Sequence, residues 1–475
     1  MSKKLALKEH IYQRIAKGIE NQISTEVIRR GDKLPSLRVL CQMHGISQST
    51  AMKVYYELES RGFIEARPQS GYFASGSYKT FAALPDTSHP DGRESNLPIE
   101  EIIEKVFNNA AERSVLLSRS VPSDEMLPIA KLNKGLVQAM RELPGSGTGY
   151  GSVQGNDKLR RQIARQTFHI PGLNHENIIT TAGCINAISY AMMAITQPGD
   201  TIIMESPVYF GVLQLAKSLG LKVIELPTHS ETGVEMEAFK KALETQNVKL
   251  CLLVTNFSNP LGSLMPDEHK KEVVRLIQHY NVPLIEDDIY GDVHFGAQRP
   301  VTCKSYDESG LVIWCSSVSK TLAPGYRVGW LEPGIFKDKI HRLKLLHSFS
   351  STNITQETVA NFLETGRYEH HLRKLRHALH INQLNYTRAI NDYFPENTKI
   401  SRPQGGFVLW VELAENINTM QLYELAIKKG ISIAPGRMFT LQDQFNNCMR
   451  LNYGMTWNEQ LNNTLKELGQ LAGKL

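Results

Sequence analysis

The chain of 475 residues is longer than one ordinary domain, and its 41% hydrophobic and 21% charged residues are typical of a globular protein. It contains no run near the roughly 18 apolar residues that a membrane helix needs, and its N-terminus lacks the apolar core of a signal peptide. We therefore expect a cytoplasmic protein of more than one domain, with no membrane partner.

The net charge of +5 is unevenly distributed. Residues 1–80 contain 13 Lys and Arg against 7 Asp and Glu, whereas the remainder contains 40 against 41. A basic excess at one end favours a polyanionic partner there, although a solvated basic surface has the same composition. The six cysteines show no CxxC spacing, so we expect free thiols and neither a metal site nor a disulfide framework.

Three helices are predicted near the N-terminus. The first covers residues 8–28 and carries isoleucines at every fourth position, namely Ile11, Ile15, Ile19 and Ile23. The second is short: Ser36 caps its start and His44–Gly45 ends it. The third runs from Ser47 to about Arg61, with apolar residues at helical spacing, namely Ala51, Val54, Tyr55 and Leu58.

Residues 63–75 are predicted to form two short strands around a turn at residues 69–71. Two helices joined by a tight turn and followed by such a strand pair have the layout of a winged helix-turn-helix. The next segment, 76–98, is rich in Gly, Ser, Pro, Asp and Thr and shows no periodicity, which indicates a linker.

Beyond about residue 105, short apolar runs alternate with helical stretches. The clearest runs are TIIME (201–205), KVIEL (222–226), VKLCLLVT (248–255), VPLIE (282–286) and LVIWCS (311–316). This alternation predicts an α/β domain with a mostly parallel sheet. In such sheets the chemistry lies in the loops that follow the strand ends.

The third helix would enter the major groove by its N-terminal end. That end and its flanks present polar and basic side chains, namely Arg38, Ser47, Gln48, Ser49, Thr50, Lys53 and Arg67. Hydroxyl and amide groups bind base edges and phosphates, whereas the arginines are placed for phosphate contacts that give affinity without sequence information. A helical module that binds protein remains the alternative.

Three stretches carry a resemblance to the GntR family of bacterial regulators: GDKLPSLR (31–38), GISQSTAMKVYYEL (45–58) and GFIEARPQSGYF (62–73). The resemblance implies a winged helix-turn-helix domain that binds double-stranded DNA. Gln69 stands where the wing turn of the family more often has glycine.

Lys320 directly follows the strand LVIWCS, among small and polar residues. Partial desolvation there lowers the pKa of a lysine, so that its amine can form a Schiff base with an aldehyde. Arginine binds a phosphate dianion in bidentate fashion, so Arg327 is a candidate for that role, and the hydroxyls of Ser317 and Ser319 can add donors.

Further polar side chains follow other strands. Asp287 can keep a pyridine nitrogen protonated, and Tyr290 and Asn259 can bond to a ring oxygen. The backbone at Gly183-Cys184 can cradle a phosphate at a helix N-terminus, and Tyr209 can stack on the ring. Each residue alone has an ordinary structural explanation as a turn, cap or core residue, but the whole set in this order is hard to obtain by chance.

This order resembles the fold-type I aminotransferases from about residue 110 to the C-terminus. The resemblance implies pyridoxal 5'-phosphate held on Lys320, with Asp287 and Tyr290 as its catalytic neighbours. Arg450, in CMRLNYG (448–454), matches the arginine that binds the substrate carboxylate. Tyr150, in GYGSVQG (149–155), matches a tyrosine that reaches the phosphate of the partner subunit, which implies a homodimer.

The two resemblances together are those of the MocR subfamily of regulators. This layout implies a winged helix-turn-helix domain at 1–75, a linker at 76–105 and an aminotransferase-like domain at 106–475 that senses the cofactor, an amine or an amino acid. In this hypothesis a ligand favours one of two arrangements of a dimer.

Two alternatives stay open. A working aminotransferase of an α-amino acid is one, because every catalytic position is intact and at least residual transamination is expected. A large domain that only dimerises the protein is the other.

Overall fold

The computed structural model describes residues 11–25, 27–29, 31–60, 62–67, 70–75, 82–108, 114–167 and 170–475. The chain divides into two compact units: one contains the residues up to Ala83 with the short stretch 387–392, and the other contains Leu84–Tyr386 and Tyr393–Leu475. Within the described ranges, no helix combines the length and the apolar content that a membrane span requires.

The small unit contains α1 (Ile11–Ser24), α2 (Leu37–His44), α3 (Gln48–Ser60), β1 (Ile64–Arg67) and β2 (Gly71–Ala74). The apolar face predicted for the third helix is fully buried, and it packs with three of the four isoleucines of α1. Ile11 is the exception, because 47% of it is exposed. The first helix also ends earlier than predicted, at Ser24, where the chain turns and the Ile28 N–H bonds back to the Gln22 carbonyl at 3.0 Å.

Local capping fixes the turn between α2 and α3. The Ser36 hydroxyl accepts a hydrogen bond from the Val39 N–H at 3.3 Å. Gly45 ends α2 with a φ of 62°, a left-handed conformation that suits glycine. The Ser47 hydroxyl then accepts from the Thr50 N–H at 3.2 Å at the start of α3. The strands β1 and β2 pair in antiparallel fashion, with Glu65 opposite Phe73. Gln69 and Arg61 lie outside the described residues.

The large unit is built on an eight-stranded sheet of order β4-β11-β10-β9-β8-β5-β6-β7. Its strands are β4 (Ile179–Thr181), β5 (Thr201–Ser206), β6 (Lys222–His229), β7 (Gly233–Val234), β8 (Val248–Leu253), β9 (Leu284–Asp287), β10 (Val312–Ser317) and β11 (Gly329–Glu332). The five central strands β5, β6, β8, β9 and β10 are mutually parallel and coincide with the five predicted apolar runs. Their nearly continuous apolar sequences reflect burial on both faces of the sheet.

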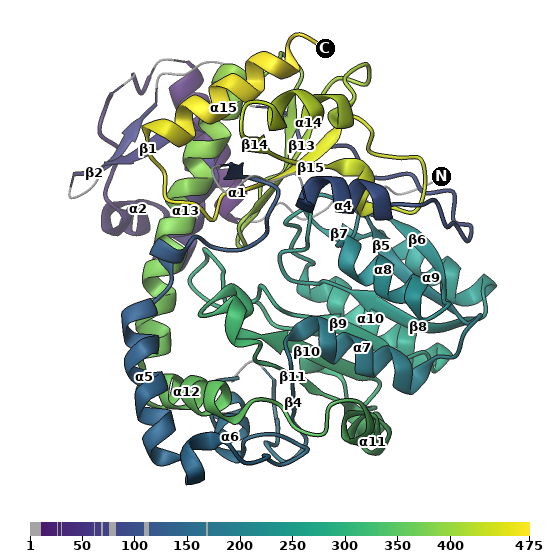
Figure 1. Cartoon of the computed structure of the whole chain (residues 1–475). Helices are drawn as coiled ribbons and strands as arrows, with labels where there is room; N and C mark the ends of the chain where they lie inside the picture. The colour runs from purple at the N-terminus through teal and green to yellow at the C-terminus, as the bar shows by residue number, and fades with distance from the viewer. Residues whose placement is uncertain are drawn as a thin grey trace. The chain divides into compact units, whose positions relative to one another are not determined.

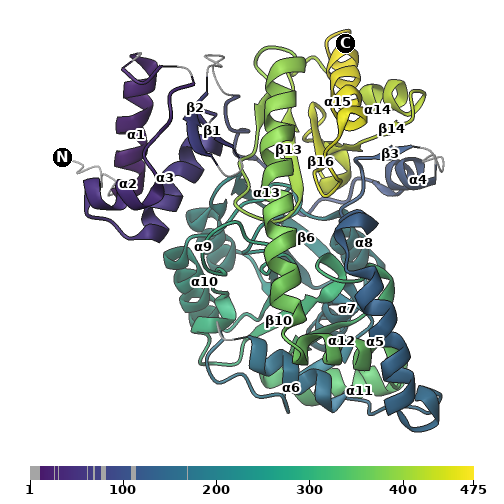
Figure 2. The same ribbon diagram turned by 90° about the vertical axis from the view of Figure 1, so that its left-hand side faces the viewer.

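The helices of this part of the chain are α4 (Glu100–Asn108), α5 (Ile129–Glu142), α6 (Asp157–Gln166), α7 (Cys184–Ile195), α8 (Phe210–Ser218), α9 (Met236–Thr245), α10 (Asp267–Tyr280), α11 (Lys337–His347), α12 (Asn353–Glu364) and α13 (Arg367–Tyr393). Of these, α7, α8 and α9 contact strands of the sheet. Figure 1 shows α7 lying across β9, β10 and β11, so that its first turn is at the ends of these strands. Figure 2 shows α5 running beside α12, with which it packs.

A second, smaller sheet follows in the chain. It has the order β12-β13-β16-β15, with β12 (Lys399–Ile400), β13 (Val408–Glu412), β15 (Ala434–Pro435) and β16 (Cys448–Asn452). A separate parallel pair joins β3 (Val115–Leu116) to β14 (Ile431–Ser432). The helices α14 (Thr419–Ile427) and α15 (Glu459–Ala472) complete this region. Trp410 on β13 lies opposite Arg450 on β16.

Much of the expected linker packs on the large unit. The Ser88 hydroxyl donates to the Ser206 carbonyl at 2.6 Å and accepts from the Thr228 N–H at 2.8 Å. Ser95 and Leu97 both donate to the carbonyl of Leu441. The composition of this segment therefore marks an irregular backbone, but residues from Leu84 onward belong to the large unit.

Candidate functional site

Lys320 lies in a short 3-10 turn (Val318–Lys320) directly after β10. Its ammonium nitrogen donates to the backbone carbonyl of Ser120 and lies 5.7 Å from the ring centroids of both Tyr290 and Phe407. Burial lowers the pKa of Lys320 to about 8, and the positive charge of Arg450 acts in the same direction. A larger share of this amine is therefore neutral and nucleophilic near pH 7 than for an exposed lysine.

Asp287 is the last residue of β9. Its Oδ1 accepts hydrogen bonds from the Cys184 thiol and from the Ile289 N–H, both at 3.2 Å. Burial raises the pKa of Asp287 to about 6, while these two donors oppose the shift. The carboxylate is therefore mainly ionised at neutral pH, as a partner of a protonated ring nitrogen must be.

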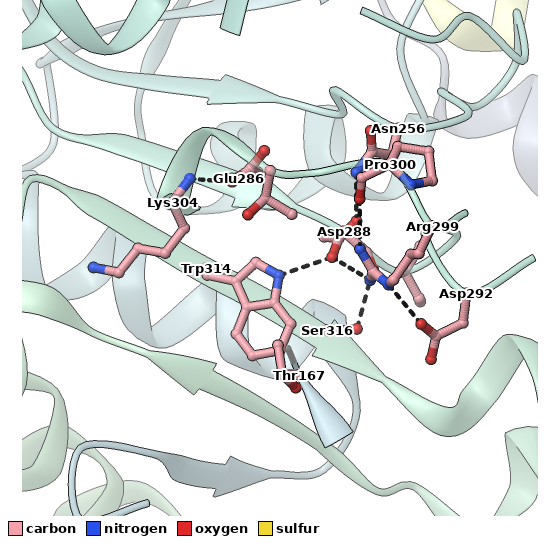
Figure 3. A network of polar contacts seen from close by, with 12 residues as sticks. Thr167, Asn256, Glu286, Asp288, Asp292, Arg299, Pro300, Lys304, Trp314 and Ser316 are labelled. Atoms are coloured by element: carbon pink, nitrogen blue, oxygen red, sulfur yellow. Dashed lines mark hydrogen bonds and ion pairs between the residues drawn. The ribbon is translucent and has the colours of Figure 1, made fainter. Parts of the chain in front are cut away.

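Asp288, the next residue, is fixed by a separate buried network. It accepts from Trp314 Nε1 at 2.9 Å, from Arg299 at 2.6 Å and from Asn256 at 3.0 Å. Figure 3 shows Asp288 between Trp314 and Arg299, with Asp292 bound to the other side of the same guanidinium. This network anchors the backbone immediately after Asp287 and so fixes the position of the strand end.

Tyr290 and Asn259 meet as the sequence predicted that they would. Asn259 Nδ2 donates to the Tyr290 hydroxyl at 3.2 Å, and Ser120 Oγ lies 2.8 Å from the same hydroxyl. Burial raises the pKa of Tyr290, so this phenol stays protonated and remains a donor. The Asn259 and Ser120 side chains thus both contact the Tyr290 hydroxyl, and the Tyr290 ring lies beside Lys320.

Gly183 and Arg327 form the end of the site suited to an anion. Gly183 has a φ of 95°, and a Cβ added there would come within 2.4 Å of Arg327 Nη2. Arg327 Nη2 donates to the Ala182 carbonyl at 2.7 Å. The chain enters α7 at Cys184, and the first N–H groups of a helix lack intrahelical partners. Ser317 Oγ accepts from the Ser319 N–H at 3.2 Å, and both serines are buried here.

A cavity of about 130 Å³ joins these groups. Its lining includes predicted residues from five separate segments, namely Cys184, Tyr209, Asn259, Asp287, Tyr290, Ser319, Lys320 and Arg327. Ile185 also lines it. The ring of Tyr209 lies close to the backbone of Gly211, where an added Cβ would come within 2.4 Å of it.

Arg450 lies on β16 and is fully buried. Its Nη1 donates to Asn259 Oδ1 at 3.0 Å, its Nη2 donates to the Ser118 carbonyl, and its guanidinium lies 5.1 Å from the ring centroid of Phe439. Within the described part of the chain, its Nε has no hydrogen-bond partner. Burial lowers the pKa of Arg450 to about 10. A buried cation with a free donor is suited to bind a carboxylate side-on through Nε and Nη2.

Tyr150 does not line this cavity. Its ring is 88% exposed and meets Phe349 edge-on at 5.2 Å between ring centroids.

The residues present fit pyridoxal phosphate together with a carboxylate-bearing ligand on four structural observations. Gly183 has no side chain where the Arg327 guanidinium lies, so this cation can approach the backbone at the start of α7. Asp287 supplies a buried carboxylate, and Arg450 supplies a buried donor without a partner. Lys320 supplies an amine of lowered pKa among them.

Sequence reasoning missed Ser118 and Ser120. They lie between β3 and the turn at Asp124–Met126 and follow no predicted strand. Their backbone carbonyls, which carry no sequence signal, make the contacts to Arg450 and Lys320. Asp288 was also missed, although an acidic pair after a buried strand could have suggested that one carboxylate is structural.

The DNA-facing residues predicted in the small unit differ in their surroundings. Arg38 and Gln48 are exposed, and no ion pair is found for Arg38 among the described residues. The hydroxyls of Ser47 and Thr50 lie 2.8 Å apart and serve the helix cap.

Two further basic residues of this set contact other side chains of the small unit. Lys53 lies over the ring of Tyr12, with 5.9 Å from its nitrogen to the centroid. Arg67 pairs with Glu65 at 2.7 Å and stacks on Phe73. The side chain of Ser49 lies outside the described residues.

Two family models match the chain. The model of the gntR family of bacterial regulatory proteins matches residues 11–73, and that of aminotransferase class I and II matches residues 116–468. The uncharacterized HTH-type transcriptional regulator YjiR of Escherichia coli K12 is 36% identical over 97% of this chain and 98% of its own length. The chain belongs to the MocR subfamily of GntR-type transcriptional regulators.

Other relatives share this two-part MocR layout. YdcR, a second uncharacterized HTH-type transcriptional regulator of Escherichia coli K12, is 34% identical over 97% of this chain and 98% of its own length. Among solved structures, the kynurenine aminotransferase of Pyrococcus horikoshii has a TM-score of 0.74 at 26% identity, covering 79% of this chain and 94% of its own. The predicted family and fold class, an α/β fold-type I aminotransferase domain after a winged helix-turn-helix, are thereby confirmed.

Proposed function

We propose that this MocR-type regulator binds pyridoxal 5'-phosphate on Lys320 and uses the loaded site to sense the cofactor or an amino acid. The observation that carries this proposal is the convergence in one cavity of a lysine of lowered pKa, a buried carboxylate and the Arg327 guanidinium beside the start of α7. When bound, the cofactor supplies an electron-withdrawing pyridine ring to an amine attached to it.

Each side chain has a separate role in this proposal. Lys320 supplies the attacking amine, and Asp287 holds a proton on the ring nitrogen. Tyr290 and Asn259 donate to the ring oxygen, while Tyr209 packs on the ring face.

The phosphate and carboxylate groups of the ligands have separate sites. Arg327, Ser317, Ser319 and the first turn of α7 hold the phosphate. Arg450 binds a carboxylate through its free Nε, so an amino acid is a better ligand than a simple amine.

We also infer a homodimer. Tyr150 is a large aromatic residue that is almost fully exposed, at the edge of the large unit and close to the exposed Phe349. In this arrangement the partner's Tyr150 reaches the phosphate end of the site. The DNA-binding domain at 1–75 and the large domain, which begins at about Leu84, then occur twice, and the two DNA modules bind two half-sites of double-stranded DNA.

A second candidate function is transamination of an α-amino acid. The intact set Lys320, Asp287, Tyr290 and Arg450 favours it, because a site used only for sensing needs no complete set. Release of a keto acid with a second amino acceptor separates this function from sensing alone.

The deciding experiment is a titration of cofactor-free protein with pyridoxal phosphate, followed by visible absorption. Wild type and the control variant Lys241→Ala, altered at an exposed position on α9, should develop the band of the protein-bound cofactor. Lys320→Ala should not. An equal, dialysis-resistant band in Lys320→Ala would contradict the proposed attachment.

The same samples then test regulation. The affinity for duplex DNA is measured in cofactor-free, loaded and amino-acid-treated protein. We expect a change of roughly 5-fold to 150-fold between at least two of these states, the usual range of allosteric coupling. Identical DNA affinities in all states would leave a DNA-binding protein with a large domain that does not signal.

A further inference from the structure

A second cavity lies on the other face of the strand ends that carry the cofactor residues. Its volume is about 570 Å³, within the usual range of small-molecule sites. Among the described residues, none lines both this cavity and the one around Lys320. Asp287 lines the cofactor cavity, whereas the next residue, Asp288, bonds to Trp314 and Arg299 in the wall of the second one (Figure 3). Successive side chains of a strand point to opposite faces of a sheet, so the two cavities lie back to back.

The inner wall of the second cavity is aromatic. Trp314 and Trp330 are both buried, and their ring centroids lie 6.2 Å apart at an interplanar angle of 56°. The exposed side chain of Gln298 lies at the mouth. Aliphatic side chains from α6, α12 and α13 complete the apolar part of the wall, namely Ile163, Leu363 and Leu372. A wall of this composition suits a flat aromatic ligand, because aromatic rings pack on one another by their faces and edges.

The charged groups of the wall are paired with one another. Arg299 donates to Asp288 and to Asp292, both at 2.6 Å. Arg376 donates through Nη1 to Glu369 at 3.0 Å. An ionic ligand would therefore meet no unpaired charge of opposite sign among the described residues of this wall, and burial of an unpaired ion costs free energy. The cavity thus favours an uncharged ligand.

Two polar groups of the wall are available for a hydrogen bond. His294 Nδ1 lies 2.8 Å from the Gly296 carbonyl, so Nδ1 carries the proton of the neutral ring and Nε2 is an acceptor. Burial lowers the pKa of His294 to about 4, and the charge of Arg376 acts in the same direction. Arg376 uses Nε for the Asp292 carbonyl and Nη1 for Glu369, which leaves Nη2 as a donor. A hydroxyl group can donate to the histidine and accept from the arginine.

We propose that this cavity is a second ligand site, which binds an uncharged aromatic molecule that carries a hydroxyl group. The ring of the ligand packs on Trp314 and Trp330, and its hydroxyl bonds to His294 and Arg376. Binding at this site does not require a cofactor.

The second cavity also contacts the backbone that carries the cofactor residues. Ser316, in its wall, donates through Oγ to the Asp288 carbonyl at 3.1 Å, and Val318 lines it two residues before Lys320. A ligand there therefore packs against the strand ends from the face opposite to the cofactor. In the part of the proposal that rests on the proposed function, this ligand changes the affinity of the protein for pyridoxal phosphate.

Calorimetric titration of the cofactor-free full chain with tryptophol tests the site. Tryptophol is an indole with an uncharged hydroxyethyl group, and we expect binding in the millimolar range or tighter for a probe of this size. Indole-3-acetate and gramine carry the same ring with a negative and a positive charge, and both should bind at least several-fold more weakly. Absence of tryptophol binding, or tighter binding of either charged analogue, would overturn the assignment.

Two variants locate the bound probe. His294→Asn retains an N–H for the Gly296 carbonyl but loses the Nε2 acceptor, and Arg376→Gln retains an N–H for the Asp292 carbonyl but loses Nη2. Each should weaken tryptophol binding about 5-fold to 10-fold, the effect of one hydrogen bond.

Two exposed positions on α10 provide the matched controls. His279→Asn and Arg275→Gln should bind tryptophol like wild type, although Arg275 pairs with Glu272 much as Arg376 pairs with Glu369. Equal affinity in wild type and all four variants would place the probe elsewhere and overturn the second site.

Repeating the titration with saturating pyridoxal phosphate tests the coupling. The affinity for tryptophol should differ at least several-fold from that of cofactor-free protein, and the affinity for the cofactor must then change by the same factor. Equal affinities would overturn the coupling and leave the second site standing. If wild-type protein forms no cofactor band, the proposed function fails, while the tryptophol titration of cofactor-free protein still decides the second site.

Discussion

The two functional regions of this chain are assembled in opposite ways. The DNA-facing groups lie between Arg38 and Arg67, are mostly exposed and are positioned by caps and turns within a few residues. The groups of the candidate cofactor site, including the contacts around its cavity, come from residues between Ser118 and Arg450, and long-range packing brings them together.

This difference has physical consequences. In the exposed region between Arg38 and Arg67, solvent and salt screen each charge. Each contact to DNA is therefore expected to add a small and salt-dependent amount to the binding free energy. In the cavity, burial raises the pKa of Asp287 and lowers those of Lys320 and Arg450. Chemistry and ligand discrimination are therefore expected from the buried region, and affinity for a polyanion from the exposed one.

The largest effect that tests this contrast is expected from Gly183→Ala. The new Cβ would come within 2.4 Å of Arg327 Nη2 and would also strain a backbone with a φ of 95°. Displacement of Arg327 should weaken binding of pyridoxal phosphate by about 100-fold, equivalent to about 2.7 kcal/mol.

Gly199→Ala is the matched control for that variant. Gly199 has a φ of 93°, but a Cβ there would meet nothing within 4 Å. It should therefore lose stability through backbone strain, on the order of 1–3 kcal/mol, and keep its cofactor affinity. Equal loss of affinity in both variants would assign the effect to strain and not to the anion end of the site.

A second test uses Glu205, a fully buried carboxyl on β5. Burial raises its pKa from 4.5 to about 8, with a smaller contribution from Asp287. The unfolded chain ionises this group from about pH 4.5, whereas the folded chain keeps it protonated. Glu205 therefore leaves the free energy of unfolding at its full value below pH 4.5. It lowers that free energy progressively as the pH rises toward 8.

Glu205→Gln should remove this dependence. Relative to wild type, the variant should gain about 2.5 kcal/mol of stability between pH 5 and pH 7, given about 1.4 kcal/mol per pH unit over most of this range. Urea unfolding of cofactor-free protein at a series of pH values measures the change. Glu237→Gln, altered at an exposed position on α9, should follow wild type. If the stability of Glu205→Gln fell with pH as steeply as that of wild type, another group would be responsible for the pH dependence.

These contrasts also explain what the sequence could predict. The strands were placed to within about three residues at their ends because apolar runs mark buried parallel strands, and this put Lys320, Asp287 and Asn259 at one edge of the sheet. Contacts made by backbone carbonyls, such as those of Ser118 and Ser120, leave no trace in residue type.

Other differences between the predicted and the observed structure came from local contacts that the hydrophobic periodicity of a sequence does not reveal. The first helix ended at Ser24, where the chain turns and the Ile28 N–H bonds back to the Gln22 carbonyl. Arg67 carried the charge expected of a phosphate contact, but the fold also gave it Glu65 as a partner.

The ion pair between Arg67 and Glu65 provides the next test. Arg38→Ala should weaken binding to a nonspecific DNA duplex about 10-fold at low salt and reduce the slope of log affinity against log salt by about 0.9, the value for one phosphate contact. Arg67→Ala should have a smaller effect, because its guanidinium already pairs with Glu65 and stacks on Phe73. Fluorescence anisotropy over a salt series measures both, and a larger loss in Arg67→Ala would reverse this assignment.

The smallest effect is expected from Ser36→Ala, which tests whether the small unit is encoded locally. The Ser36 hydroxyl satisfies the Val39 N–H at the start of α2, and loss of such a cap costs about 1 kcal/mol. Exchange of the α2 amides should therefore accelerate by about 5-fold, the factor that corresponds to 1 kcal/mol. Ser36→Asp should restore slow exchange, because a carboxylate caps equally well and also favours the helix dipole. If alanine had no effect, packing of α2 rather than its cap would set the geometry of the turn, and the contrast with the cofactor cavity would be weaker than proposed.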